Sequence, residues 1–198
     1  MATIGLKDLY YAPITEDEDG AETFGTPKIL SKAISAELSV EYAEGTLYAD
    51  DALDENPKAF SSGTLTLGVK ELGSEAAAAL LGAKVDDNGV LVSSAEDVGQ
   101  PVAIGFRALK ADRKSYRYVW LYRVLFSVPS ETYNTKADSF EFQTPEIEGT
   151  IMQRKTPDSR GEFNWKAAMD SNESGVDSAT ITGWFSKVYE PEFSEVGA

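Results

Sequence analysis

The sequence contains no cysteine and no histidine. Without cysteine it can form no disulfide and no thiolate metal site, and it has no cysteine nucleophile. Without histidine it lacks the commonest general base and a frequent ligand of transition metals. The chain also shows no phosphate-binding glycine loop and no Gly-x-Ser-x-Gly motif. We therefore expect no catalytic residue, no cofactor and no metal ion, and a protein that is not an enzyme.

Positive charge is scarce, with 18 Lys and Arg against 33 Asp and Glu in 198 residues, a formal net charge of −15. Attractive binding to nucleic acid or to an anionic membrane needs a basic surface, which this balance disfavours. No apolar run is long enough to span a membrane, and the N-terminus lacks the pattern of a secretory signal. We expect one domain with a real core, made in a cytoplasm and at first retained there.

The most informative stretch is Tyr116–Ile151, which predicts two strands and their connection. Residues 116–128 are dense in aromatic and β-branched side chains, which suit a buried strand. Residues 139–151 alternate between apolar and polar side chains, with a change of register expected at Pro145 because proline has no N–H. The second strand therefore predicts a sheet with one apolar face and one acidic, polar face.

Two further segments predict a long hairpin. Residues 33–42 alternate strictly, with one apolar face formed by Ile34, Ala36, Leu38, Val40 and Tyr42. Residues 62–69 alternate in the same way, and the intervening residues 44–59 are rich in turn formers. A connection of that length is usually functional or disordered rather than a simple link.

The remaining elements complete a mainly β fold. Residues 74–81 predict the only helix, with Ser74 as N-cap and Gly82 as the stop. Residues 102–110 and 180–189 predict strands, 162–169 a strand or short helix, and 86–89 a hairpin turn. Residues 1–30 are interpreted as an N-terminal arm and 190–198 as a tail. The sum is a β-sandwich or partly rolled barrel with one flanking helix, in a single domain spanning 1–198.

Charge is unevenly distributed along the sequence. Residues 33–47, 59–69 and 138–153 contain seven acidic residues and no Lys or Arg, whereas 101–128 contains six cations and one acid. One interpretation is an ordinary solvated surface on an acidic protein. The other is a continuous Ser/Thr/Glu surface from which cations are excluded, as a wall that DNA passes without sticking requires.

Three other groups of residues have both a functional and a structural interpretation. Clustered acids could bind a hard cation, although their spacing is not that of an EF-hand and a solvated or inter-subunit loop is favoured; they are Asp50, Asp51, Asp54 and Glu55. Glu146 and Glu148 could act as paired carboxylates, but two residues apart on one strand they fit a surface better. An aromatic stripe could stack on sugars or form core, and the core is favoured; it comprises Tyr116, Tyr118, Trp120 and Tyr122.

Three segments in order resemble a known family. Gly5–Ala12, Leu47–Asp51 and Ser130–Ile151 together are similar to the major tail proteins of long-tailed, non-contractile phages and prophages of Gram-positive bacteria. The resemblance runs over nearly the whole chain, to its Trp184–Phe193 end.

The resemblance implies a tail-tube protein that stacks as rings of six. Four strands of each subunit would close into a shared inner barrel, a long hairpin loop would reach the adjacent ring, and DNA would pass down the lumen without specific binding. The implied partners are further copies of the chain and the tape-measure, tail-terminator and distal-tail proteins, with no membrane. The implied location is the virion tail, assembled in the host cytoplasm.

Position in the family pattern assigns residues to three surfaces. The lumen would be lined by Ser35, Glu37, Ser39, Glu41, Ser62, Thr64, Thr66, Glu141, Gln143, Glu146 and Glu148. The inter-ring loop would use Leu47, Tyr48, Asp50, Asp51, Asp54 and Lys58. The inter-subunit arm would use Leu6, Leu9, Tyr10 and Tyr11. The rival hypothesis is a monomeric carbohydrate-binding or adhesion β-sandwich, which needs an exposed aromatic platform.

Overall fold

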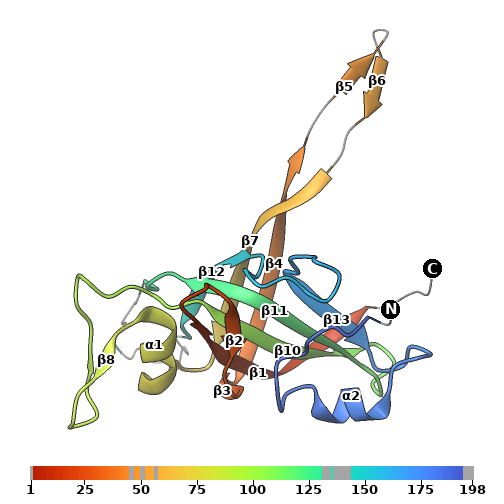
Figure 1. Ribbon diagram of the computed structural model, residues 1–198. Coiled ribbons are helices and arrows are strands. Elements are labelled where there is room, and N and C mark those ends of the chain that lie inside the picture. The colour runs from red at the N-terminus through yellow and green to blue at the C-terminus, as the bar shows by residue number, and fades with distance from the viewer. Residues whose placement is uncertain are drawn as a thin grey trace.

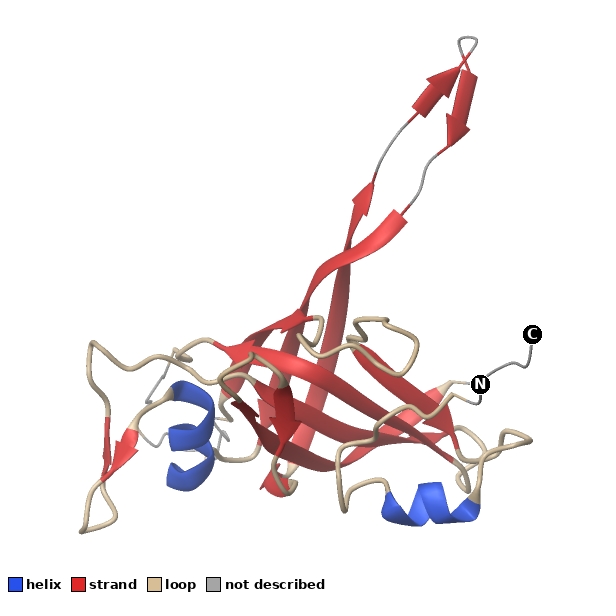
Figure 2. Cartoon of the chain, in the orientation of Figure 1, coloured by secondary structure: helices blue, strands red, loops and turns tan. Residues whose placement is uncertain are grey.

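Figures 1 and 2 show the computed structural model, which describes residues 2–44, 47–49, 52–55, 58–130, 135 and 144–193. The described chain is mainly β, as predicted, with two helices rather than one. Its elements are β1 (Thr3–Glu16), β2 (Glu22–Phe24), β3 (Lys28–Ser31), β4 (Ala33–Glu44), β5 (Leu47–Ala49), β6 (Ala52–Glu55), β7 (Lys58–Val69), α1 (Ser74–Leu81), β8 (Lys84–Val85), β9 (Leu91–Val92), β10 (Val102–Lys110), β11 (Tyr116–Phe126), β12 (Glu146–Met152), β13 (Lys166–Asp170) and α2 (Ser178–Gly183).

Nine strands form one antiparallel sheet in the order β2-β1-β10-β11-β12-β7-β4, with β3 also on β1 and β13 also on β11. Strand β11 pairs with β10 along one edge. Its other partners are β12, opposite its C-terminal half, and β13, opposite its N-terminal half. The strand predicted from residues 116–128 is therefore the centre of the sheet.

The sheet curls around a first core. Leu9 of β1, Leu65 of β7, Ile104 of β10, Leu121 of β11 and Ile147 of β12 are all fully buried in one cluster. Strands from distant positions in the sheet order thus meet on one face, and β4 approaches β1. This is the geometry of a partly rolled barrel.

A second core lies on the other face of β11. Tyr118, Trp120 and Tyr122 pack there against Trp184 and Val188, which follow α2. Trp120 donates its indole N–H to the Trp184 carbonyl at 3.0 Å. The aromatic stripe is therefore core, as the sequence favoured, and the strand is buried on both faces.

The strand predicted for residues 180–189 is wrong. Helix α2 and an irregular segment occupy this region, and Asp177 caps the helix by accepting the Ala179 N–H at 3.3 Å. Trp184 and Val188 bury against β11 by packing across its face rather than by pairing with its edge. The apolar side chains of this stretch therefore cover one face of the sheet and do not mark a strand.

The first thirty residues are not an arm. Strand β1 pairs with β10 over most of its length, inside the main sheet. The register shifts between Lys7 and Tyr10, where Asp8 takes a positive φ of 54°. This bulge breaks the alternation of apolar side chains, which is why the sequence concealed the strand.

Register shifts interrupt the alternation of side chains in β11 and in β4. In β11, Ile104 pairs with Leu121 but Val102 pairs with Val124, so one extra residue is accommodated there. Residues after this bulge change face, so that Arg123 lies opposite the core side chains. In β4, irregularities near each end leave two predicted inward residues exposed; these are Ile34 and Tyr42.

Helix α1 agrees with its predicted bounds but not with its predicted cap. Its N-cap is Gly73 rather than Ser74, and no side chain caps it. Gly82 ends the helix with φ 76° and donates its N–H to the Ala78 carbonyl at 3.0 Å. The helix covers one end of the first core with its buried Leu80.

Candidate assembly surfaces

Strands β4, β7 and β12 align polar side chains in rows across their outer face. Thr66 pairs with Glu37 on one side and with Glu148 on the other. Thr64 pairs with Ser39 and Thr150 in the same way. We call this surface the polar face; its residues are Ser35, Glu37, Ser39, Glu41, Ser62, Thr64, Thr66, Glu146, Glu148 and Thr150.

The polar face follows directly from alternation. Leu65, Leu67 and Val69 are fully buried, so the residues between them point away from the core. The hydroxyl of Ser62 donates to the Glu41 carboxylate at 2.9 Å, which links β7 to β4. All four glutamates of the face are exposed. Glu141 and Gln143, also predicted for the lumen, lie outside the described residues.

Cations are nearly absent from these strands. Within β4, β7 and β12 the single Lys or Arg is Lys58, at the far end of β7. Its ammonium lies 2.5 Å from the Glu44 carboxylate, so the charge of Lys58 is neutralised in an ion pair where the hairpin leaves the body. The rest of the polar face carries only negative charge among its ionisable groups.

The polar face ends at a free strand edge. Among the strands that the structure describes, β4 pairs with β7 alone and is the last in the sheet order. Its sequence contains neither Lys nor Pro, two residues that commonly protect an edge from pairing with another chain. Its exposed Ile34 and Tyr42 add apolar surface near the two ends. A long edge of this kind is a template for further strand pairing.

Strands β4 and β7 lead into a projecting hairpin. Strands β5 and β6 pair with each other and stand clear of the body (Figures 1 and 2). Of the predicted inter-ring residues, Leu47 and Tyr48 belong to β5, Asp54 to β6 and Lys58 to the start of β7. Asp50 and Asp51 lie outside the described residues.

The residues predicted for an inter-subunit arm are engaged within their own chain. Leu9 and Tyr11 are buried in the first core. Tyr10 stacks on Phe185 with a centroid distance of 4.6 Å. Leu6 is half-buried at the margin of a cleft beside β1. An arm role for Leu9 and Tyr11 is therefore wrong, because the domain's own core needs them.

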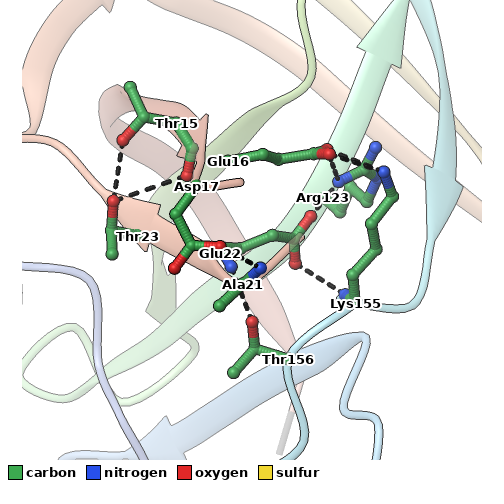
Figure 3. Close-up of polar contacts among 9 residues, drawn as sticks. All are labelled: Thr15, Glu16, Asp17, Ala21, Glu22, Thr23, Arg123, Lys155 and Thr156. Carbon is green, nitrogen blue, oxygen red and sulfur yellow. Dashed lines mark hydrogen bonds and ion pairs between the residues drawn. The ribbon is translucent and has the colours of Figure 1, made fainter. Parts of the chain in front are cut away.

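One polar cluster was not predicted from the sequence. Figure 3 shows Glu22 of β2 directed toward Arg123 of β11, with Glu16 and Lys155 beside them. The side chain of Glu22 is fully buried and that of Arg123 is 11% exposed. We call these four residues the Glu22 cluster. They come from distant parts of the chain, which is why no local pattern revealed them.

The Glu22 cluster joins three segments. Glu22 forms an ion pair with Arg123 and accepts the Lys155 backbone N–H at 2.6 Å. Hydrogen bonds from Lys155 and Arg123 lower the pKa of Glu16 below its ordinary value. The hairpin of β1 and β2 is thereby tied to β11 and to the segment after β12. Arg123 is compensated within its own subunit and adds no free charge beside the polar face.

The clustered acids predicted as an alternative cation site include Asp50 and Asp51, which lie outside the described residues. Glu146 and Glu148 point from the same face of β12, two residues apart on one strand. Among the residues described, no group of three or more His, Cys, Asp or Glu side chains is placed to hold a metal ion. No helix of the described chain has the length and apolar character to cross a bilayer. Comparison with protein-family models and with curated proteins finds no match.

Breaking the Glu22 cluster should destabilise the fold. Arg123→Leu leaves the Glu22 carboxylate buried without its cation, which we expect to lower the free energy of unfolding by about 3–5 kcal/mol. The matched control is Lys28→Leu, which removes the exposed pair with Glu75 and should leave the free energy of unfolding nearly unchanged because solvent screens that pair. Urea denaturation at neutral pH measures both.

A second variant separates charge burial from lost packing. Adding Glu22→Gln to Arg123→Leu removes the uncompensated charge and should recover part of the lost stability. Equal losses for Arg123→Leu and Lys28→Leu would contradict a structural role for the cluster.

Proposed function

We propose that the chain is a structural tube protein of phage tails, which polymerises as stacked hexameric rings around an acidic lumen that conducts DNA. The observation that carries the proposal is the polar face: Glu, Ser and Thr side chains cover three adjacent strands and end at β4, the last strand in the sheet order. The resemblance of the sequence to major tail proteins supplies the form of the assembly. The partners would be other copies and the remaining tail proteins, in the virion tail.

The chemistry of the polar face suits a wall that DNA must pass. Each Lys or Arg that contacts a phosphate releases counterions and adds attraction, which would hold DNA in place. Glutamates repel phosphates over about 8 Å at physiological ionic strength, and short hydroxyl side chains between them leave the wall smooth. The observed face combines both properties, with Lys58 paired at its far end.

The free edge of β4 gives the polar face a way to continue. A neighbouring subunit that adds its sheet to this edge would satisfy the backbone groups that β4 exposes and extend the polar face around a ring. Strands β12, β7 and β4 are adjacent in the sheet and carry the polar face, so these three strands of each subunit would line the shared barrel. The projecting hairpin β5–β6 is then free to contact the next ring (Figure 1).

A carbohydrate-binding module is the weaker hypothesis. It needs several aromatic rings exposed on one surface. Tyr118, Trp120 and Tyr122 are instead at most 5% exposed and covered by the segment that follows α2. The aromatic stripe of β11 therefore offers no exposed platform for a sugar to stack on.

Reversing charge on the polar face should slow DNA passage without preventing assembly. In phage carrying Glu37→Lys, Glu41→Lys and Glu148→Lys, we expect tubes of normal appearance and DNA ejection slowed by roughly tenfold or more, because lysines bind phosphate. Time-resolved ejection from purified virions measures this. The matched control reverses three exposed acids elsewhere: Glu18, Glu162 and Glu173. Normal ejection with the reversed polar face would refute the lumen assignment.

Removing the projecting hairpin should prevent stacking and leave the fold intact. Deletion of residues 48–58 shortens only the part that stands clear of the body (Figure 2). We expect an unchanged urea midpoint and rings that do not stack, as seen by electron microscopy. Tubes of normal length from this variant would exclude the hairpin as the inter-ring contact.

A further inference from the structure

The first core is covered at one end and open at the other. Helix α1 covers one end with Leu80. At the other end an open cleft is lined by the half-buried side chains of Leu6, Leu38 and Phe106, from β1, β4 and β10, with the buried Val119 of β11 beside them. An apolar cleft at the end of a core is a candidate interaction surface.

Two cations also line this cleft. Arg117 is exposed at the start of β11 and Lys166 begins β13. Burial, together with the charge of Arg117, lowers the pKa of Lys166 below its ordinary value. Neither side chain forms an ion pair with any residue that the structure describes. Lys166 lies 4.8 Å over the Trp165 ring, a cation–π contact that leaves its charge unneutralised. Among the described residues, the cleft therefore combines apolar surface with two cations that no carboxylate pairs.

A second apolar surface, with acidic rather than basic neighbours, lies at the other end of the body. The hairpin β8–β9 and the residues after it expose a set of valines between 43% and 69%; these are Val85, Val90, Val92 and Val98. Around them four acids outnumber one exposed cation, Lys84; the acids are Asp86, Asp87, Glu96 and Asp97. Asp86 fixes the turn by accepting the N–H groups of Asn88 at 2.9 Å and Val90 at 2.8 Å. The β8–β9 hairpin therefore presents valine and carboxylate side chains on a turn that is already fixed.

These two surfaces cannot meet within one chain. Figure 1 shows β8 beside α1 at one side of the body, and β13 with the N-terminal end of β1 at the other. A contact between them must join two copies, head to tail. Such a heterologous contact generates a ring when its rotation closes.

We propose that the β8–β9 hairpin of one copy docks in the open cleft of the next copy. Its valines would cover the apolar side chains of the cleft, and its acids would meet Arg117 and Lys166. Electrostatic complementarity of this kind fixes the partner and the register of a contact. The proposal rests on the self-association in the proposed function and adds the surfaces that make a lateral contact beyond the strand edge.

Cysteine trapping tests this contact cleanly because the chain has no cysteine. Val90→Cys is placed on the hairpin of one preparation and Thr3→Cys, at the cleft, on another; both positions are exposed. The two proteins are mixed at high concentration and oxidised, and mixed disulfide dimers are counted by intact mass. The matched control replaces Val90→Cys by Val128→Cys, at a position 78% exposed that belongs to neither surface.

We expect the Val90–Thr3 pairing to exceed the control by roughly tenfold or more, and a chain with both cysteines to form a ladder of oligomers. Adding Arg117→Glu to the Thr3→Cys protein should reduce the pairing by about tenfold, because acid then meets acid. Arg117 is exposed, so this variant should keep its urea midpoint. Pairing no greater than the control, or pairing unaffected by Arg117→Glu, would overturn the proposal.

The same samples separate this inference from the proposed function. Rings or tubes in the electron microscope without specific pairing would overturn the lateral contact alone. Specific pairing in a protein that forms neither rings nor tubes would support the contact and count against the tail tube.

Discussion

The burial of β11 on both of its faces is the constraint on which the other parts of the structure depend. Val119 and Leu121 pack into the first core, while Tyr118 and Trp120 pack against the segment after α2. A strand buried on both faces must have partners along both edges, and β10 fills one edge while β12 and β13 share the other. The polar face therefore lies on β12, β7 and β4, the strands that follow β11 in the sheet.

Charge separation follows from the same arrangement. The cation-rich stretch 101–128 forms β10 and β11, and several of its cations are compensated within the subunit: Arg107 by Asp8, Lys110 by Asp170 and Arg123 by Glu22. The bulge in β11 is what turns Arg123 toward its acidic partners. Strands β12, β7 and β4 are left with acids and hydroxyls alone along the polar face. An acidic wall and a basic centre thus coexist in one sheet.

Local periodicity predicted those parts of the fold in which each residue faces a fixed side. The inward leucines of 62–69 follow from alternation, and the end of the helix 74–81 follows from its Gly82 stop. The polar face followed for the same reason, since inward leucines force the intervening residues outward.

Features that depend on contacts between distant segments were not predicted. The bulge at Asp8 breaks the alternation of β1, so the strand was not predicted. The apolar residues around Trp184 pack on β11, and their pattern was wrongly interpreted as a strand. The Glu22 cluster joins residues more than a hundred positions apart, and the open cleft exists only because the sheet rolls. Contacts between residues so far apart leave no pattern in any short stretch of the sequence.

The measurement that tests the tube most directly is negative-stain electron microscopy of the purified protein at high concentration, with and without a preformed tail tip as a seed, alongside light scattering. We predict rings or long hollow tubes, with a rise in scattered intensity as they grow. A protein that stays monomeric under both conditions would contradict the tube and direct attention to a glycan-binding screen.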